Sequence, residues 1–376
     1  MCIRDRMNDL QNKCRGSLIG GAVGDALGYA VEFSSLNEIR KKYGENGITD
    51  YELDRNGIAE FSDDTQMSLF TVEGLLCAIA AGKIHEKEIL PFITTAYEHW
   101  YYTQSRPALK MSKSWLTNVK ALWARRAPGM TCMSALQSIS MPNSAPVVNN
   151  SKGCGGVMRV APIGIFSAAN PKLLDLEHAG YLAGYAADIT HKHPLSTYSS
   201  MALAMIVADC IAHDNVDREM LRFIVMERVF KLLGLYFKED RHLAELRTLV
   251  QKALDFAVSD RTDTDAIYIL GEGWVAEETL AIAIFSVMRY IDDFEKCICC
   301  AVNHSGDSDS TGAVAGNIIG GILGYNAIPE KYKPNLELHD LLLSVADDLC
   351  GFSSRDQIEE RYVNHKPFNV KPSELL

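Results

Sequence analysis

Two segments near opposite ends of the chain carry glycine at every fourth position, and this pattern limits the folds available to the 376-residue sequence. Glycine lowers helix stability by up to about 1 kcal/mol relative to alanine, so its repetition needs a structural reason. Residues four apart share one helix face, and a face without side chains lets another helix approach at short range. We therefore expect both segments to be closely packed helices, each beside an acidic cluster. The glycines are Gly16, Gly20, Gly24 and Gly28 in the first segment, and Gly312, Gly316, Gly320 and Gly324 in the second.

The remainder of the chain also has a helical pattern. Four further segments have apolar residues at three- and four-residue spacing and charged residues on the opposite face. Alternation typical of strands is hard to find, and prolines fall where helices should end. The polar stretches 142–156 and 259–273 are predicted to be loops, where binding residues of helical proteins tend to lie. The helical segments are Met201–His213, Arg218–Leu235, Arg241–Ala257 and Glu277–Tyr290.

The composition argues against several classes of protein. Hydrophobic residues make up 47% and charged residues 23% of the chain, as in ordinary globular proteins. Residues such as Asp25, Arg159 and Asn317 interrupt the most apolar segments, so no transmembrane helix is predicted. Acidic residues outnumber basic ones by 48 to 37 with no basic block, which argues against nucleic acid or an anionic membrane as a partner. Length alone favours about two domains.

The first residues and the cysteines bear on location. Residues 1–8 lack the apolar stretch and cleavage site of a secretory signal, and Met7 is the better start, so we expect a non-native or disordered leader. The ten cysteines are irregularly spaced, which predicts free thiols in a reducing, cytoplasmic compartment. Cys297 and Cys300 form a C-x-x-C pattern, but no second pair completes a zinc site. This favours small apolar residues on a buried helix.

Two acidic clusters precede apolar helical segments. Ser62, Asp63 and Asp64 form the first cluster, and the segment 307–310, Asp-Ser-Asp-Ser, forms the second. As helix caps, such residues would satisfy free backbone N–H groups and the helix dipole. Hard divalent cations instead need about six oxygen ligands, which these carboxylates and hydroxyls supply. Four carboxylates brought together would repel strongly without cations, although the spacing does not establish that the two clusters meet.

Five segments in this order resemble the ADP-ribosyl-acceptor hydrolase family. These all-helical enzymes include dinitrogenase-reductase-activating glycohydrolase and the ADP-ribosylarginine hydrolases. The combination of G-D-A-L-G, S-D-D-T and G-D-S-D-S in one order is specific, whereas each motif alone is not. The segments are GSLIGGAVGDALGYAVEF at 16–33, FSDDTQM at 61–67, GCGGVMRVAPIG at 153–164, Thr190-His191, and GDSDSTGAVAGNIIGG at 306–321.

The resemblance implies one compact, orthogonal all-α domain over residues 9–368, and it outweighs the two-domain prior from length. It also implies a monomer with two Mg²⁺ ions, or Mn²⁺, at the centre of the domain. The implied activity is hydrolysis of the bond between C1″ of ADP-ribose and a protein side chain. The serine within G-D-S-D-S is similar to that of family members that act on arginine, so it favours ADP-ribosylarginine as the substrate. The implied metal ligands are Ser62, Asp63, Asp64, Asp307, Asp309 and Ser310.

The family match also assigns roles around the cations. A departing guanidine is basic and needs a proton, so Asp63, Asp64 or Glu32 is the expected catalytic acid or positioning group. Each further candidate has a plainer alternative: Glu32 as a solvated carboxylate, the glycine-rich segment as a tight turn, His191 as a capping residue, and the aromatic residues as core. Cys154 departs from the G-N-G common in the family. The expected substrate-binding residues are Glu32, Asn150, Gly153, Cys154, Gly155, Gly156, His191, Tyr198 and Trp274.

Two rival hypotheses remain open at the level of sequence. One is a binding or immunity protein that recognises ADP-ribose or blocks a cognate ADP-ribosyltransferase by contact; the presence of all four aspartates argues for catalysis instead. The other is a hydrolase of another substrate, such as serine-linked ADP-ribose or O-acetyl-ADP-ribose. Variable loops build the acceptor side, so the sequence does not separate these substrates.

Overall fold

A computed structural model describes residues 3–105, 114–141 and 146–366, and within these residues the protein is all-helical. Two isolated β-bridges join loops, and no strand is present in the described ranges. The α-helices are α1 (Ile3–Tyr29), α2 (Leu36–Tyr43), α3 (Asp63–Ala80), α4 (Glu86–Ser105), α5 (Met130–Ser140), α6 (Ala161–Ala169), α7 (Leu176–Asp188), α8 (Pro194–Ala212), α9 (Arg218–Phe223), α10 (Phe230–Tyr236), α11 (Arg241–Ala257), α12 (Asp263–Leu270), α13 (Ala276–Arg289), α14 (Phe294–Val302), α15 (Ser308–Leu323), α16 (His339–Leu349) and α17 (Arg355–Tyr362). Short helices are η1 (Leu116–Asn118), η2 (Lys120–Trp123), η3 (Cys154–Gly156), the π-helical η4 (Ile224–Val229), η5 (Tyr325–Ala327) and η6 (Glu330–Tyr332).

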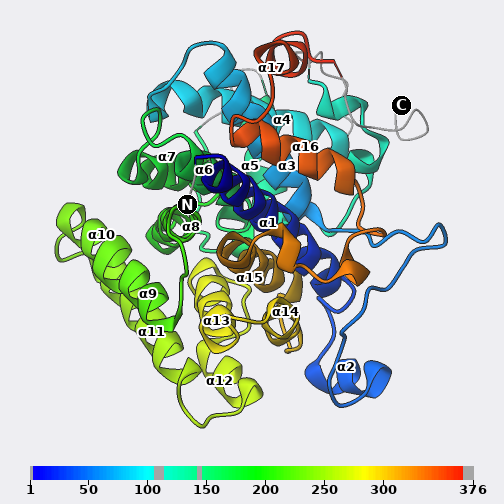
Figure 1. Ribbon diagram of the computed structural model, residues 1–376, viewed down its shortest axis with the longest axis vertical. Helices are drawn as coiled ribbons and strands as arrows, with labels where there is room; N and C mark the ends of the chain where they lie inside the picture. The colour runs from blue at the N-terminus through cyan, green and yellow to red at the C-terminus, as the bar shows by residue number, and fades with distance from the viewer. Residues whose placement is uncertain (1–2, 106–113, 142–145, 367–376) are drawn as a thin grey trace.

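The two glycine-striped helices, α1 and α15, lie against each other in the middle of the molecule (Figure 1). Their glycines meet in antiparallel order: Gly16 faces Gly320, Gly20 faces Gly316 and Gly24 faces Gly312. A methyl group at any of these positions would overlap a backbone atom of the facing helix. The expectation of closely packed glycine helices is therefore confirmed.

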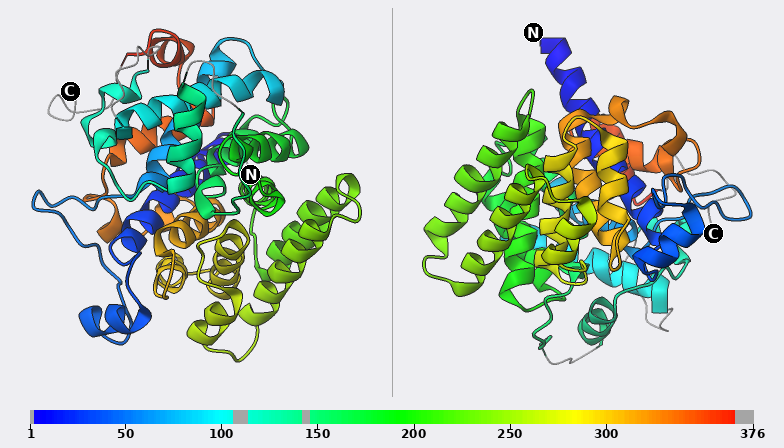
Figure 2. Two further views of the ribbon diagram at one scale, coloured as in Figure 1. Left: turned by 180° about the vertical axis from the view of Figure 1, so that it is seen from behind. Right: turned by 90° about the horizontal axis from the view of Figure 1, so that it is seen from below.

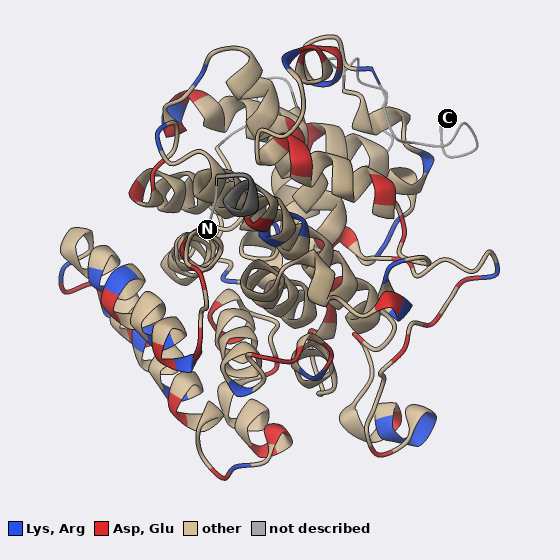
Figure 3. Ribbon diagram, viewed as in Figure 1, with Lys and Arg blue, Asp and Glu red and all other residues tan. Residues whose placement is uncertain are grey.

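The other helices surround this pair. α13 and α14 pack against α15, and α16 packs against α1. α3 lies on α4, and α6 and α7 lie on α8. The segment α9–α11 forms a long arm at one side, along which Lys and Arg alternate with Asp and Glu (Figures 1 and 3). Since α1 and α15 are central, Asp25 in the C-terminal half of α1 and the residues at the start of α15 lie deep in the fold.

Helices α8, α11 and α13 confirm three of the expected helical segments. The segment Arg218–Leu235 is helical too, but η4 interrupts it with a π-helical turn. The prediction that residues 259–273 form a loop was wrong for the middle of this stretch, where α12 forms. Thr262 caps α12 by accepting a hydrogen bond from the Asp265 N–H at 3.1 Å, and one apolar face of this helix is buried against α11 and α13. The short apolar face was hidden among polar residues in the sequence. The other predicted loop, 142–156, is non-helical over residues 146–153 and ends in the short helix η3. Residues 142–145 lie outside the described residues.

The ends of the chain bear on two expectations. Residues 3–8, within the expected leader, form the first turns of α1, which project from the body in the view from below (Figure 2). The leader and the single domain over 9–368 stay predictions. The expectation that all cysteines are free was wrong, because Cys14 of α1 forms a disulfide with Cys350 at the end of α16. The packing of α1 on α16 brings these distant residues together. Seven other described cysteines are free.

Helix α8 is long and apolar enough to cross a membrane by length and composition alone. In this fold 89% of its most apolar window is buried inside the protein, as in a core helix. Ser196, Ser199 and Ser200 are also fully buried within it. The expectation that no membrane is a partner stays a prediction.

Candidate functional site

The two acidic clusters converge where α1, α3 and α15 meet. Carboxylate oxygens of Glu32, Asp307 and Asp309 all lie within 4.8 Å of one another. The start of α3 joins this group: burial raises the pKa of Asp63 and Asp64, and the nearby Asp309 charge raises it further. All members of the cluster are buried. The acidic cluster, as we use the term, consists of Asp25, Glu32, Ser62, Asp63, Asp64, Asp307, Asp309 and Ser310.

Asp25 attaches the start of α3 to α1. One carboxylate oxygen accepts a hydrogen bond from the Ser62 N–H at 2.8 Å; the other accepts from the N–H and the hydroxyl of Thr65, at 2.9 and 2.5 Å. Ser62 caps α3 by accepting from the Asp64 N–H at 3.2 Å. The capping interpretation of Ser62 is therefore confirmed, and the cap turns the next two carboxylates toward α15.

The start of α15 is shaped by Gly306. Its φ of 143° and the close approach of the Glu272 backbone leave no room for a side chain. The Asp307 N–H donates to the Glu272 carbonyl oxygen at 2.8 Å. Asp307 occupies the N-cap position of α15, but its side chain makes no capping hydrogen bond. Its carboxylate is thus available to the acidic cluster, unlike a simple cap.

Burial and mutual repulsion raise the pKa of five of these carboxyl groups. Burial, with the Asp309 charge second, raises the pKa of Asp25 to about 7 and that of Glu32 to about 10. The same two causes raise the pKa of Asp63, Asp64 and Asp307 well above its ordinary range. The acidic cluster is therefore electrostatically unfavourable in its fully ionised form unless positive charge accompanies it.

The acidic cluster fits divalent cations. Glu32 Oε2, Asp64 Oδ2 and Asp307 Oδ2 are buried and accept no hydrogen bond. Buried polar atoms without partners are rare in proteins, and hard cations take carboxylate oxygens as ligands. These atoms come from three different helix ends, so a cation bound there would also connect α1, α3 and α15. Which residues ligate, and which metal binds, stays a prediction.

Stability should depend on pH and on divalent cations together. A carboxyl group whose pKa is raised on folding contributes stability that is complete below its unfolded pKa of about 4. That contribution is lost as the pH rises through the folded pKa values of Asp25, about 7, and Glu32, about 10. We therefore expect the melting temperature in chelator to fall from pH 5 to pH 8, and added Mg²⁺ or Mn²⁺ to raise it more at pH 8. Equal cation effects at both pH values, measured by calorimetry, would contradict this expectation.

The glycine-rich segment Gly153–Gly156 is held next to the acidic cluster by backbone pairing. The Cys154 N–H donates to the Trp274 carbonyl oxygen at 3.2 Å, and the Ala276 N–H donates to the Lys152 carbonyl oxygen at 2.8 Å. The adjoining residues 272–273 contact the start of α15. The cluster, the glycine-rich segment and the segment 272–276 therefore form one connected region.

His191 lies directly under the glycine-rich segment. A methyl group at Gly155 would lie 2.8 Å from the His191 ring. Burial and the nearby Arg159 charge lower the pKa of His191 to about 3, so its ring is neutral, and Nδ1 contacts the Thr190 hydroxyl at 2.8 Å. Arg159 is fully buried, donating to the Ala186 carbonyl and the Thr190 hydroxyl and lying 4.3 Å from the Tyr97 ring centre. It therefore acts as a structural residue.

The remaining expected substrate-binding residues lie in different surroundings. Asn150 is exposed, whereas its neighbour Asn149 holds the segment 190–192 through the Thr190 carbonyl and the Lys192 N–H. Tyr198 is buried against Phe237, with ring centres 4.9 Å apart. Trp274 is 40% exposed and stacks on exposed Phe33 at 6.2 Å, beside Glu32. Of the two expected aromatic residues, Trp274 is the one whose ring is exposed enough to contact a base or ribose.

Sequence reasoning missed two features of the acidic cluster. Asp25 was taken only as an interruption of an apolar run, although it organises the start of α3. Nor did the sequence show that the Glu32 carboxylate lies among those of Asp307 and Asp309; the expected role of Glu32 toward the substrate stays a prediction. An aspartate inside a glycine stripe was the available indication, since a buried charge on a close-packed helix requires partners.

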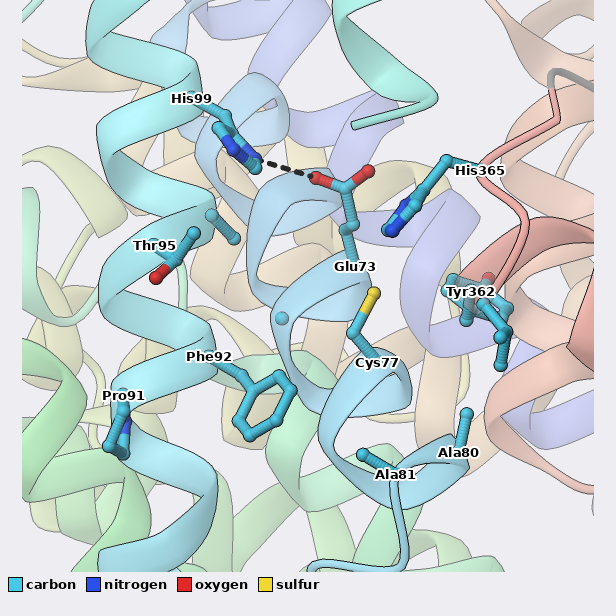
Figure 4. A pocket seen from close by; sticks show the side chains of 13 residues that line it. Glu73, Cys77, Ala80, Ala81, Pro91, Phe92, Thr95, His99, Tyr362 and His365 are labelled. Atoms are coloured by element: carbon cyan, nitrogen blue, oxygen red, sulfur yellow. Dashed lines mark ion pairs between the residues drawn. The ribbon is translucent and has the colours of Figure 1, made fainter. Parts of the chain in front are cut away.

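A separate pocket of about 510 Å³ lies between α3, α4 and the C-terminal segment (Figure 4). Glu73, Cys77, His99 and His365 line it together with apolar residues. Glu73 lies roughly 13 Å along α3 from Asp64, at 1.5 Å per residue. Its carboxylate accepts hydrogen bonds from the Ser114 hydroxyl at 2.8 Å and the Trp115 N–H at 3.2 Å, so it anchors the segment that contains η1. This pocket is distinct from the acidic cluster.

Known proteins are similar to this chain over most of its length. The family model described as ADP-ribosylglycohydrolase matches residues 6–358. The ADP-ribosyl-[dinitrogen reductase] glycohydrolase of Rhodospirillum rubrum is 27% identical over 338 residues, covering 88% of this chain and 92% of that protein. An ADP-ribosylarginine hydrolase of Serratia proteamaculans is 24% identical, covering 90% and 79%. A solved ADP-ribosylglycohydrolase-related protein complex has the same fold, with a TM-score of 0.61 and 22% identity over 92% of this chain and 100% of that one.

Proposed function

Because the chain belongs to the ADP-ribosylglycohydrolase family, we propose that it removes ADP-ribose from modified arginine side chains of proteins. ADP-ribosyl hydrolysis, divalent-cation dependence and ADP-ribosylated protein substrates are properties of this family. The single observation that carries the proposal is the buried acidic cluster with three carboxylate oxygens that have no hydrogen-bond partner. The arginine acceptor rests on a distant relative that is an ADP-ribosylarginine hydrolase and on the serine in G-D-S-D-S.

The ligands in this proposal are Ser62, Asp63, Asp64, Asp307, Asp309 and Ser310, and Glu32 lies beside them without serving as a ligand. Two bound cations, Mg²⁺ or Mn²⁺, would supply charge stabilisation at the ribose hydroxyls and an activated water. The Ser62 cap and the Asp25 hydrogen bonds keep the carboxylates of α3 aimed at those of α15. The chain thus orients its ligands before substrate arrives.

Glu32 is the proposed proton donor to the leaving guanidine. Burial and the Asp309 charge raise its pKa to about 10, so the carboxyl group holds a proton at neutral pH in the metal-free cluster. A basic leaving group needs a proton as its bond to C1″ breaks. Replacing Glu32 by Gln should lower kcat more than it raises KM, and it should flatten the alkaline limb of the pH–rate profile. An unchanged profile would assign the proton to Asp63 or Asp64.

The region beside Gly153–Gly156 offers room for the ADP moiety. A pocket of about 520 Å³, a size ordinary for small-ligand sites, is lined by three basic side chains, Lys152, Arg241 and Lys252, and by three acidic ones, Glu245, Glu277 and Glu278. The Lys152 backbone pairs with the segment that also carries Trp274. In the proposal, backbone N–H groups of the glycine-rich segment bind pyrophosphate, and the Trp274–Phe33 pair covers a ring of the substrate.

The deciding experiment measures free ADP-ribose released from an arginine-ADP-ribosylated protein, with Mg²⁺, with Mn²⁺ and with chelator. A serine-linked substrate and O-acetyl-ADP-ribose are assayed in parallel. Metal-dependent release from arginine alone supports the proposal, whereas release only from another substrate replaces the acceptor. Tight ADP-ribose binding without release from any substrate would favour a binding or immunity protein that blocks a transferase. The cytoplasmic location and the monomeric state are part of the same proposal, and fractionation and light scattering test them.

A further inference from the structure

Asp63 is held from behind by the segment 126–129. Its N–H donates to the Arg126 carbonyl oxygen at 3.1 Å, and the Gly129 N–H donates to its Oδ2 at 3.3 Å. Asp63 is the first residue of α3, where a backbone N–H has no partner within the helix. One segment therefore fixes both the main chain and the carboxylate of this residue.

The Arg126 guanidinium ties this segment to the chain that leads into α3. Nη1 donates to the Phe61 carbonyl oxygen at 2.9 Å and to Glu337 Oε2 at 3.0 Å. Nη2 donates to Glu60 Oε1 at 2.9 Å and to Glu337 Oε1 at 3.2 Å. A bidentate pair of this kind fixes orientation as well as distance. Because Glu60 and Phe61 directly precede the Ser62 cap, the guanidinium also steadies the entry to α3.

The carboxylate that binds Arg126 on two sides is itself fixed by backbone pairing. The Glu337 N–H donates to the Ala59 carbonyl oxygen at 3.1 Å, and the Ala59 N–H donates to the Asn335 carbonyl oxygen at 2.8 Å. Glu337 and Arg126 are both buried. The guanidinium therefore binds a carboxylate that the backbone holds in place.

The backbone between Arg126 and Gly129 needs this support. Ala127 has a φ of 49°, in the left-handed region that a residue with a Cβ rarely adopts. Such a conformation persists only where surrounding contacts impose it. Loss of the guanidinium contacts would let Ala127 relax and carry the Gly129 N–H away from Asp63.

The charge of Arg126 does not balance the acidic cluster. Among the described residues, its side chain makes its hydrogen bonds and ion pairs to Phe61, Glu60 and Glu337, none of which belongs to the acidic cluster. The guanidinium and its two carboxylates together carry a net negative charge. Arg126 therefore acts on the acidic cluster through geometry.

We propose that Arg126 is a positioning residue of the cation site: its guanidinium fixes the segment 126–129, and that segment presents the Asp63 carboxylate before a cation binds. Outer contacts of this kind orient the ligands of metal sites. A lysine ammonium is a point charge without the planar fork that bridges a carbonyl oxygen and two carboxylates. The inference rests on the cation dependence within the proposed function and is independent of its arginine acceptor.

The test measures the Mn²⁺ affinity of the metal-free full-length protein by electron paramagnetic resonance, which detects free Mn²⁺. Wild type is compared with Arg126→Lys and with Arg289→Lys, a matched control. Arg289, the last residue of α13, also binds a carbonyl oxygen, that of Ser259 at 2.8 Å, and a carboxylate, that of Asp263 at 3.2 Å. Both variants should melt at a lower temperature than wild type. We expect Mn²⁺ affinity to fall about 10–100-fold in Arg126→Lys alone.

Wild-type Mn²⁺ affinity in a folded Arg126→Lys variant would overturn the inference, and so would an equal loss of affinity in Arg289→Lys. If Arg126→Lys does not fold, as judged by circular dichroism, Glu337→Gln decides instead. Gln keeps the backbone pairing but lacks the charge that orients the guanidinium. A lower Mn²⁺ affinity in Glu337→Gln supports the inference, and an unchanged affinity contradicts it.

A separate hydrolysis assay distinguishes this inference from the proposed function. Mn²⁺ binding by wild type without release of ADP-ribose from any substrate defeats the proposed function alone. Hydrolysis by wild type, with equal Mn²⁺ affinity in Arg126→Lys, defeats this inference alone.

Discussion

Replacing Asp307 by Asn should lower the rate of ADP-ribose release by about 10²–10³-fold, the loss that follows removal of one preorganised electrostatic group. Asp307 Oδ2 is buried without a hydrogen-bond partner, and Glu32 and Asp309 lie beside it. The substitution removes a charge that binds cations in the proposed function. It also removes repulsion, so the metal-free variant should be at least as stable as the wild type. Rate and melting temperature with and without Mg²⁺ measure both effects.

A matched control separates the site from general effects of charge. Asp292 is an exposed aspartate in the turn before α14, and Asp292→Asn should leave rate and cation response unchanged. Asp309→Asn repeats the test within the acidic cluster. If Asp307→Asn and Asp309→Asn are folded and keep most of their activity with normal cation dependence, the assignment of a cation site to these residues is wrong.

Replacing Gly20 by Ala should lower the free energy of unfolding by about 3 kcal/mol, the upper end of the range for overpacking. The added methyl group would overlap the Gly316 carbonyl oxygen, and backbone cannot rotate away as a side chain does. Gly316→Ala makes the reciprocal overlap and should destabilise by a similar amount. Urea denaturation with a circular dichroism signal measures both.

Gly234 provides the control for this prediction. It lies in α10, and a methyl group there would meet nothing within 4 Å. Gly234→Ala should therefore raise stability by up to about 1 kcal/mol, through helix propensity alone. Whether a glycine-to-alanine substitution raises or lowers stability thus depends on which atoms face the glycine. Equal stability of Gly20→Ala and wild type would remove the argument that close backbone contact explains the stripe.

The helical architecture was predictable from local patterns, with exceptions where polar residues hid an apolar face. Long amphipathic segments such as Arg241–Ala257 appear as helices with the predicted bounds. α12 was missed because its buried residues Ala266, Ile267 and Leu270 are few and lie within a polar stretch. The Cys14–Cys350 disulfide was missed because its two residues meet only through the packing of α1 on α16.

The acidic cluster was predictable in its residue types and only partly in its membership. The order of the motifs identified Asp63, Asp64, Asp307 and Asp309, and the structure confirms that these clusters converge. The sequence did not reveal that Glu32 lies among them, or that Asp25 holds α3 in place.

The sequence alone determined the helix-forming segments, the glycine faces and the oxygen-rich residues suited to hard cations. These properties depend on residues close together in sequence. Folding decides which glycine meets which, and therefore where the ends of α1 and α15 lie. Those ends bring Asp25, Glu32 and Asp307 into one buried volume, where burial and repulsion raise the pKa of each. Burial and charge–charge distances arise from contacts between residues hundreds of positions apart, so they exist only in the packed protein.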